Sequence, residues 1–167
     1  MNNRILITGA LGQLGKFFID SLINQGNYVL ATDIKNSNDL NCDFEIFDVY
    51  DLKKGDELIK KYKINQVYNF AAILSAKGEI NPAKTWDLNN GGFFNIVDIC
   101  LKNKINKIFW PSSIAVFGKN SNLNFASIDE PMCPETIYGA SKLACEKAMY
   151  YYNSVSYTHL RAHETSP

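Results

Sequence analysis

The sequence predicts an α/β fold in which helices cover both faces of a doubly wound parallel sheet. Short runs of β-branched and apolar residues alternate with longer segments whose apolar residues recur at helical spacing, which is typical of β-α-β units. A glycine-rich turn joins the first strand to the first helix, as in sheets of this class that bind a ligand. Hydrophobic residues make up 46% of the 167 residues, enough to fill the core of one domain.

Five strands are expected where β-branched and aromatic runs end in polar or turn residues, over residues 5–8, 28–33, 44–49, 66–69 and 107–111. Four helices are expected from apolar residues spaced three or four apart, over residues 14–24, 52–62, 82–103 and 138–152. The third helix begins at Pro82, a favourable first-turn residue. Its interior Gly91-Gly92 pair costs about 1 kcal/mol per glycine, which indicates close approach by a ligand or another backbone.

Composition argues against several classes of function. The 17 Lys and Arg residues balance the 17 Asp and Glu residues, so no net charge favours nucleic acid or an anionic membrane as partner. No apolar run is long enough for a membrane span or a signal-peptide core, which favours a cytoplasmic protein. The cysteines form no C-x-x-C pair and are expected to be reduced and structural, at Cys42, Cys100, Cys133 and Cys145. Histidine occurs only in the last nine residues, so no metal site is predicted.

A G-x-x-G-x-x-G motif separates the first strand from the first helix, with the sequence Gly9-Ala10-Leu11-Gly12-Gln13-Leu14-Gly15. Gly9 permits the tight turn out of the strand, Gly12 lets the backbone reach a pyrophosphate, and Gly15 lets the helix pack against the sheet. The free N–H groups and the positive end of the helix then face the phosphates. The motif therefore predicts a dinucleotide-binding loop that includes the backbone of Leu11, Gln13 and Leu14.

Two carboxylates follow the next strands. Asp33 ends the second strand 24 residues after Gly9, where a carboxylate accepts hydrogen bonds from the adenosine ribose and repels a 2′-phosphate, which favours NAD over NADP. Asp48 and Val49 follow the third strand. In a doubly wound sheet Asp48 would accept from the adenine amino group there, and Val49 would pack on the ring. On local evidence, Asp48 is equally well explained as the acidic start of a helix.

Tyr138 and Lys142 form a Y-x-x-x-K motif at the start of the last helix, where residues four apart share a face. A neighbouring ammonium and the positive ring of oxidised nicotinamide both favour phenolate, so we expect the Tyr138 pKa to fall below its ordinary value of about 10. Ser112 and Ser113 end the fifth strand, at the edge where such sheets bind ligands. Together these residues predict a Ser-Tyr-Lys site for hydride transfer; alone, the serines are explained as turn residues.

These motifs resemble those of the extended short-chain dehydrogenase/reductases, a superfamily of Rossmann-type fold that includes the UDP-galactose 4-epimerases. The resemblance covers residues 4–153 and includes Asn69-Phe70-Ala71-Ala72 and Asn89. Within the superfamily the chain is most similar to L-threonine 3-dehydrogenases, in Ile73-Leu74-Ser75-Ala76, in Trp86-Asp87-Leu88-Asn89 and above all in Phe109-Trp110-Pro111-Ser112-Ser113-Ile114-Ala115-Val116-Phe117-Gly118. Sugar-nucleotide epimerases and dehydratases usually carry another serine or threonine where Trp110-Pro111 stands. Asn90-Gly91-Gly92 departs from the usual threonine dehydrogenase sequence.

The resemblance implies NAD as cofactor and L-threonine as the small-molecule substrate, oxidised at its β-hydroxyl to 2-amino-3-oxobutanoate. Tyr138 would take the hydroxyl proton, Lys142 would hold the ribose and tune Tyr138, and Ser113 would orient the hydroxyl. Ser75 and Ser112 would also contact the substrate. The cofactor side of the site would be completed by Ala71, Ala72 and Asn89.

The superfamily continues past the Tyr-Lys helix with further strands and a substrate-binding lobe, so the fold is expected to be incomplete. Residues 1–153 are expected to form the NAD-binding domain, and residues 154–167 a disordered, non-native tail without the pattern of a sixth strand. Residues 156–165 resemble translated adapter read-through, which predicts a truncated reading frame, weak NAD binding and little threonine turnover. His159 and His163 lie four apart in this tail, where a metal site is the alternative to a polar, frayed terminus.

Two further functions stay open. A sugar-nucleotide epimerase or dehydratase would use the same cofactor domain, and Trp110-Pro111 is the feature that argues against it. A non-catalytic NAD-binding module would use the same fold, but it has no need of a complete Ser-Tyr-Lys set. In the superfamily, helices equivalent to residues 82–103 and 138–152 often pair two subunits, so a homodimer is also expected.

Overall fold

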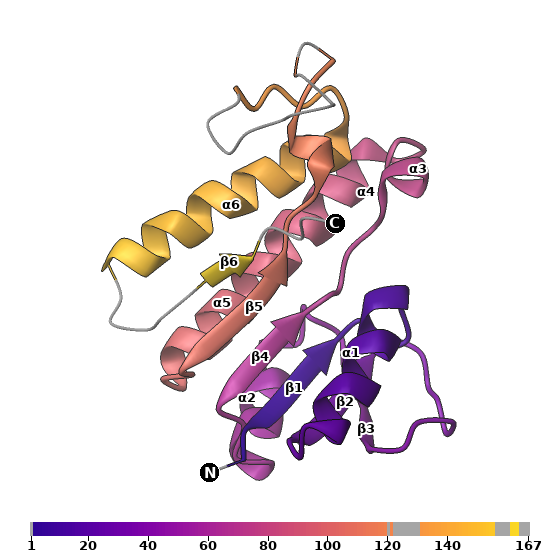
Figure 1. Ribbon diagram of the computed structural model, residues 1–167, viewed down its shortest axis with the longest axis vertical. Helices are drawn as coiled ribbons and strands as arrows, with labels where there is room; N and C mark the ends of the chain where they lie inside the picture. The colour runs from indigo at the N-terminus through magenta and orange to yellow at the C-terminus, as the bar shows by residue number, and fades with distance from the viewer. Residues whose placement is uncertain (1, 120, 122–130, 156–160, 164–167) are drawn as a thin grey trace.

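The computed structural model describes residues 2–119, 121, 131–155 and 161–163, and these form a parallel sheet with flanking helices (Figure 1). The sheet order is β3-β2-β1-β4-β5-β6, with all five pairings parallel. The strands are β1 (Arg4–Thr8), β2 (Tyr28–Asp33), β3 (Asp43–Ile46), β4 (Gln66–Asn69), β5 (Lys107–Pro111) and β6 (Arg161–His163). Strand order reverses between β1 and β4, the position at which such sheets bind ligands. The predicted Rossmann-type fold is confirmed.

The helices are α1 (Gln13–Asn24), α2 (Leu52–Lys61), α3 (Ser75–Gly78), α4 (Pro82–Trp86), α5 (Phe93–Lys102) and α6 (Ile137–Val155), with a π-helical turn η1 (Asp87–Gly92) and a 3-10 turn η2 (Ile114–Val116). The long helix expected over 82–103 is therefore interrupted by η1. A Cβ on Gly92 would lie 2.8 Å from Cγ2 of Val49, so a side chain makes the close approach that the glycine pair indicated. Helices are often widened in this way next to functional sites.

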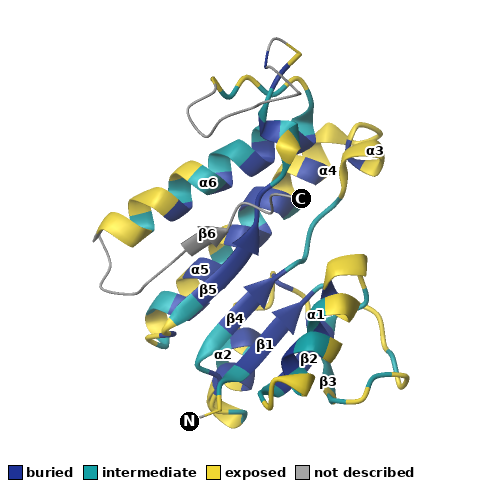
Figure 2. Ribbon diagram, in the orientation of Figure 1, coloured by how far each residue is buried: buried dark blue, intermediate teal, exposed yellow. Residues whose placement is uncertain are grey.

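The two faces of the sheet are covered unequally. Side chains from α2, α5 and α6 pack on one face, in a cluster that includes Leu6, Val67, Ile96, Trp110 and Met149. On the other face, α1 packs in a smaller cluster that includes Ile5, Ile19, Leu22, Tyr68 and Phe109. Figure 2 shows the central strands buried between these layers, as expected for parallel strands. Neighbouring residues of β5 therefore face different helices: Phe109 faces α1, and Trp110 faces the α5 and α6 side.

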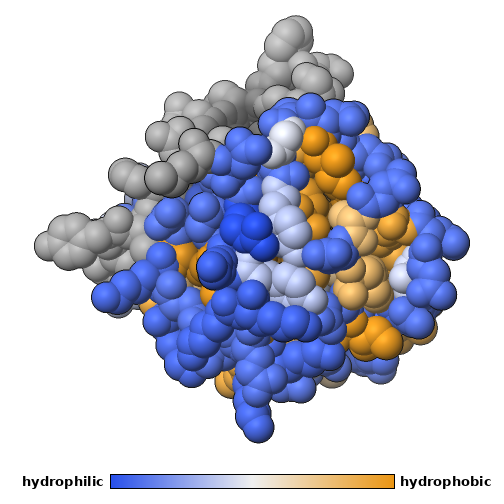
Figure 3. All heavy atoms as spheres, turned by 90° about the horizontal axis from the view of Figure 1, so that it is seen from below, coloured by the Kyte–Doolittle hydropathy of each residue, from blue (hydrophilic) through white to orange (hydrophobic). Residues whose placement is uncertain are grey.

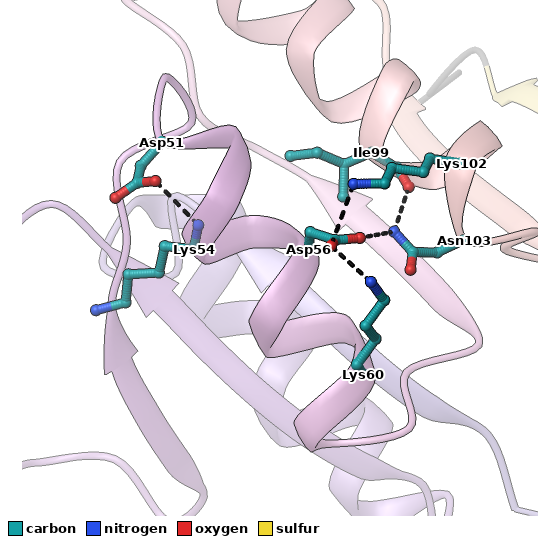
Figure 4. A network of polar contacts seen from close by, with 7 residues as sticks. All are labelled: Asp51, Lys54, Asp56, Lys60, Ile99, Lys102 and Asn103. Atoms are coloured by element: carbon teal, nitrogen blue, oxygen red, sulfur yellow. Dashed lines mark hydrogen bonds and ion pairs between the residues drawn. The ribbon is translucent and has the colours of Figure 1, made fainter.

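A polar network joins two helices of the larger layer (Figure 4). On α2, Asp56 accepts hydrogen bonds from Lys60 (2.6 Å) and from Asn103 Nδ2 (2.8 Å), and it lies 3.2 Å from Lys102 at the end of α5. These donors hold the pKa of Asp56 well below its usual range. One turn earlier, Asp51 caps α2 by accepting from the Lys54 amide. The network fixes α2 against the end of α5, and the cap stabilises the start of α2.

The C-terminal segment differs from the sequence prediction. Residues Arg161–His163 form β6, paired in parallel with β5 in the register Phe109↔Arg161 to Pro111↔His163. A sixth strand, which the sequence pattern did not indicate, is therefore present in these three residues, and Ser154 and Val155 continue α6. Backbone groups at the open edge of β5 can pair with a segment whose side-chain pattern is not strand-like. His159 and the rest of the segment compared with adapter read-through, at 156–160 and 164–165, lie outside the described residues.

The surface at the amino ends of the strands is mainly hydrophilic, with hydrophobic side chains gathered on one side of it (Figure 3). The strand arrows in Figure 1 point away from this surface, so the carboxyl ends lie at the opposite end of the molecule. Among the described residues, no helix combines the length and apolar character needed to cross a bilayer.

Candidate active site

A cleft of about 430 Å³ opens at the carboxyl ends of β1 to β4. Seven residues predicted to bind the cofactor line it: Gly9, Gly12, Asp33, Asp48, Val49, Ala71 and Ala72. The sequence interpretation missed eight others: Thr8, Ile34, Phe47, Tyr50, Phe70, Lys84, Asp87 and Leu88. Most of the missed residues are adjacent in sequence to predicted ones. Apolar character alone could not show whether such a residue lines the cleft or lies in the core. Lys84, Asp87 and Leu88 come from α4 and η1, whose position depends on how those helices pack.

Gly9 and Gly15 have the backbone geometry that their spacing predicts. Gly9 has φ +63°, and a Cβ there would lie 2.7 Å from the backbone carbon of Phe70. A Cβ on Gly15 would lie 2.6 Å from Ala10 Cα, so only glycine lets α1 approach the first turn. Gly12 starts α1 with extended backbone, and neither a capping side chain nor an acidic residue covers this end of the helix. Phosphate groups therefore fit the start of α1, where no capping side chain takes up the amides of the first turn.

Asp33 connects the glycine loop to the end of β2. Its Oδ2 accepts from the Leu11 amide at 3.1 Å, and its Oδ1 accepts from the Lys35 amide at 3.2 Å. The Leu11 amide is therefore used within the protein rather than left for a phosphate. Gln13 and Leu14 lie in the exposed first turn of α1. The carboxylate is held at the edge of the cleft, where it can accept from the hydroxyls of a ribose.

We expect Asp33→Asn to weaken NAD binding about tenfold and to narrow the preference for NAD over NADP. The amide removes the charge that strengthens hydrogen bonds to the ribose and that repels a 2′-phosphate. Isothermal titration of the purified chain with NAD and with NADP measures both effects. Asp39→Asn is the matched control, because Asp39 is an exposed residue of the same region outside the cleft. An unchanged ratio of the two affinities would contradict this role.

Asp48 and Tyr50 form one wall of the cleft after β3. Asp48 Oδ1 accepts from the Tyr50 amide at 3.0 Å, and the cap of α2 is Asp51, so Asp48 is not the helix-starting residue of the alternative reading. Tyr50 Oη donates to Asp87 Oδ2 at 2.9 Å and joins this wall to η1. Burial, followed by the Asp87 contact, raises the pKa of Tyr50 to about 12. The sequence could not predict this bridge, since its partners lie 37 residues apart.

The predicted catalytic groups meet where α6 starts beside the end of β5. Tyr138 is mostly buried and hydrogen-bonds with Ser113, which also accepts from the Ala115 amide at 3.2 Å. Burial raises the pKa of Tyr138, and the Ser113 hydrogen bond opposes that rise. The expected lowering of this pKa by Lys142 is therefore wrong for the protein by itself. The Lys142 ammonium lies 5.7 Å from the Tyr138 ring centroid and donates instead to the Pro111 carbonyl at 2.8 Å.

The remaining predicted residues have mixed positions. Ser112 donates to Glu146 on α6, so its hydroxyl is engaged within the protein and does not point freely to a substrate. Ser75 is exposed at the first residue of α3, which packs against α6. Asn89 is buried, exchanges hydrogen bonds of 2.8 and 3.0 Å with the Ile73 backbone, and donates to Ser141 Oγ at 3.2 Å. It braces the segment after β4 against α6 and does not line the cleft.

Comparison with known proteins agrees with this geometry. The NAD dependent epimerase/dehydratase family matches residues 5–163. An uncharacterized epimerase/dehydratase of Staphylococcus saprophyticus is 38% identical over 160 residues, covering 89% of this chain and 48% of that protein. The GalE-like L-threonine dehydrogenase of Cupriavidus necator superposes with a TM-score of 0.92 at 30% identity, over 96% of this chain and 54% of that one.

The UDP-glucose 4-epimerase of Brucella ovis, in complex with NAD, superposes with a TM-score of 0.89 at 26% identity, over 97% of this chain and 51% of that one. The chain thus spans about half the length of the relatives it matches. The glycine cradle, the open start of α1 and the Asp33 carboxylate all fit a dinucleotide. The chain belongs to the NAD dependent epimerase/dehydratase family, and its cofactor is NAD.

Proposed function

We propose that this chain carries the cofactor domain and catalytic groups of an NAD-dependent L-threonine 3-dehydrogenase. The observation that carries the proposal is the Ser113–Tyr138 hydrogen bond beside buried Lys142, at the same sheet edge as the cofactor cleft. L-threonine as substrate is supported by the resemblance of residues 109–118 and by similarity to threonine dehydrogenases such as that of Clostridium difficile (35% identity, TM-score 0.89). The product would be 2-amino-3-oxobutanoate.

Ser113, Tyr138 and Lys142 have separate roles in this oxidation. Ser113 hydrogen-bonds with Tyr138, and its single hydroxyl proton can turn toward the substrate oxygen when that oxygen binds beside the phenol. Tyr138, as phenolate, accepts the proton of the β-hydroxyl while the carbon loses its hydride. Bound NAD supplies the ring that accepts the hydride and a positive charge that favours the phenolate. The buried Lys142 ammonium adds positive charge on the same face of α6 and, in this proposal, holds the ribose hydroxyls.

We expect Tyr138→Phe to lower threonine-dependent NADH formation at least about a hundredfold, because the proton acceptor is lost. The binding of NAD should change little, since the phenyl ring keeps the packing of a mostly buried residue. Absorbance of NADH measures the first effect and calorimetry the second. Tyr151→Phe, at an exposed tyrosine later on α6, is the control for removing a hydroxyl. Equal activity in wild type and Tyr138→Phe would exclude this catalytic role.

A sugar-nucleotide epimerase is the second candidate, supported by the curated relatives and by the Brucella ovis structure. The structure removes one argument against it. Trp110 is only 3% exposed, packs edge-on against Phe93 (ring centroids 5.4 Å apart) and does not line the cleft. In the described residues, Trp110, which stands where sugar-nucleotide enzymes usually carry a serine or threonine, is therefore not in a position to contact a substrate in the cleft.

Product analysis separates the candidate functions. The purified chain, at high concentration with NAD, is supplied either with L-threonine or with UDP-glucose. We expect NAD binding and slow NADH formation with L-threonine alone, because the chain spans half the length of its relatives. Formation of the other hexose from UDP-glucose would favour the epimerase. Binding of NAD without turnover of either substrate would favour the non-catalytic module.

We also propose that two copies pair through α4, α5 and α6. These helices leave aromatic side chains exposed at Trp86, Phe94, Tyr150 and Tyr151. Burying such side chains in a symmetric helix pair removes apolar surface from water. Light scattering after size exclusion measures the mass directly; a monomer at micromolar concentration would contradict pairing.

A further inference from the structure

Lys142 is the one buried lysine among the described residues, with 5% of its surface exposed. Its ammonium donates to the carbonyl of Pro111 at 2.8 Å and lies 4.2 Å from the centroid of the Trp110 ring. Both contacts come from the last two residues of β5. Edge-on packing against Phe93 holds the indole in place, so its face stays turned toward the ammonium. A desolvated cation over an indole face is a strong form of cation–π contact.

One helical turn after Lys142, Glu146 supplies a carboxylate on the same side of α6. Ser112, the first residue after β5, donates to Glu146 Oε1 and ties this carboxylate to the strand that carries Trp110 and Pro111. The charge of Glu146 favours the protonated form of Lys142. Three consecutive residues, Trp110 to Ser112, therefore act on the lysine, two directly and one through Glu146.

We propose that Trp110, Pro111 and Glu146 form a cradle that positions the Lys142 ammonium, and that Trp110 and Glu146 are positioning residues for the reaction. The proposal rests on the function proposed above and assigns to Trp110 a role other than substrate selection. Ser112 belongs to the cradle as the anchor of Glu146. Trp110, whose presence distinguishes threonine dehydrogenases from sugar-nucleotide enzymes in sequence, thus acts through Lys142.

The cradle matters because burial destabilises the charged form of Lys142, which the proposed reaction requires. Desolvation lowers the pKa of Lys142 from its ordinary value of 10.5 to about 8. Loss of a contact that favours the ammonium would lower this pKa further, toward about 7. A neutral lysine can neither attract ribose hydroxyls as a cation nor favour phenolate at Tyr138. The indole face and the Glu146 carboxylate therefore influence what fraction of Lys142 stays protonated near neutral pH.

The other titratable groups around the ammonium do not supply this support near neutral pH: an ionised Cys145 would favour the charged form of Lys142 more strongly than Glu146 does, but its thiol is neutral there. Tyr138 and Cys145 flank Lys142 on α6, and burial raises the pKa of Cys145 to about 12, which keeps the thiol neutral. The neighbouring elements contribute only uncharged groups here: Asn89 and Asn90 of η1 contact Cys145, and Ser113 contacts Tyr138. Glu146 is thus the carboxylate that acts on Lys142 in the described part of the chain; the side chains of β6 lie outside it.

Titration of the Lys142 ammonium by isotope-edited NMR, on the chain without NAD or substrate, tests the cradle directly. We expect Trp110→Leu to lower the Lys142 pKa by about one unit, and Trp110→Phe to restore most of it because the aromatic face returns. Glu146→Gln and Ser112→Ala should lower it as well, the second by releasing the carboxylate. Trp86→Phe, at an exposed tryptophan of α4, is the matched control and should leave it unchanged.

Each outcome decides the proposal. Equal Lys142 pKa values in wild type, Glu146→Gln and Trp110→Leu would overturn it. Glu146 is only partly buried, so Glu146→Gln keeps the test valid if Trp110→Leu does not fold. A second readout compares NAD with ADP, which lacks the nicotinamide riboside: Glu146→Gln should weaken NAD binding severalfold and leave ADP binding unchanged. If the wild type binds neither NAD nor ADP, the proposed function is contradicted. The NMR titration of Lys142 still tests the cradle in that case.

Discussion

Lys142→Met should stabilise the folded chain at pH 7 by about 1–3 kcal/mol while abolishing turnover. The fall in the Lys142 pKa from 10.5 to about 8 corresponds to about 3 kcal/mol of cost for keeping the ammonium in a buried place. Methionine has a similar length and no charge to desolvate. Loss of the Pro111 hydrogen bond and the Trp110 contact offsets part of the gain.

The pH dependence of this effect has a definite sign. Between pH 8 and 10.5 the unfolded chain holds the lysine proton more tightly than the folded chain, so wild-type stability rises with pH across this window. Below pH 8 the full cost is present in wild type and absent from Lys142→Met. The advantage of the variant should therefore be largest at pH 7 and shrink as the pH approaches 10.5.

Urea unfolding followed by circular dichroism at pH 7 and pH 10 measures both parts of the prediction. Other groups that titrate in this range are common to the two proteins, so they cancel in the difference. Lys147→Met, at an exposed lysine of the same helix, is the control and should change stability by less than about 0.5 kcal/mol at either pH. A variant less stable than wild type at pH 7 would show that the cradle outweighs the cost of burial.

Gly139→Ala should destabilise the fold by about 1–3 kcal/mol and separate the catalytic groups. A Cβ at this position would lie 2.1 Å from the Ala115 carbonyl oxygen and 2.9 Å from Pro134 Cβ, so α6 or η2 must move. Tyr138 directly precedes Gly139, and Ser113 directly precedes η2. Movement of either element lengthens the Ser113–Tyr138 contact, and threonine turnover should fall together with stability.

Gly91→Ala is the matched control for this substitution. In η1 the added Cβ would lie 3.5 Å from Asp87 Oδ1, an ordinary contact distance, so helix propensity decides the outcome. Alanine should be neutral there, or stabilising by up to about 1 kcal/mol. Opposite signs for the two variants in denaturant unfolding are the expected result. Equal stability of Gly139→Ala and wild type would mean that α6 does not lie this close to the Ala115 carbonyl in solution.

The local features of the cofactor site could be predicted from sequence because their causes are local. Gly9 and Gly15 are required by a turn and a packing contact within a few residues of the chain. Asp33 follows at a distance that one β-α-β unit sets. The same holds for the shared face of Tyr138 and Lys142, which follows from the pitch of a helix.

Only the tertiary structure decided which groups those side chains meet. Lys142 shares a face with Tyr138, yet its ammonium is held by Pro111 and Trp110, 31 and 32 residues earlier in the chain. Burial raises the pKa of Tyr138, and the group that opposes the rise is Ser113 rather than Lys142. The close approach of Val49 to Gly92 in η1 likewise comes from another part of the chain, which no helical pattern records. Spacing along a chain determines the face on which a side chain lies, whereas its partners depend on how separate elements pack.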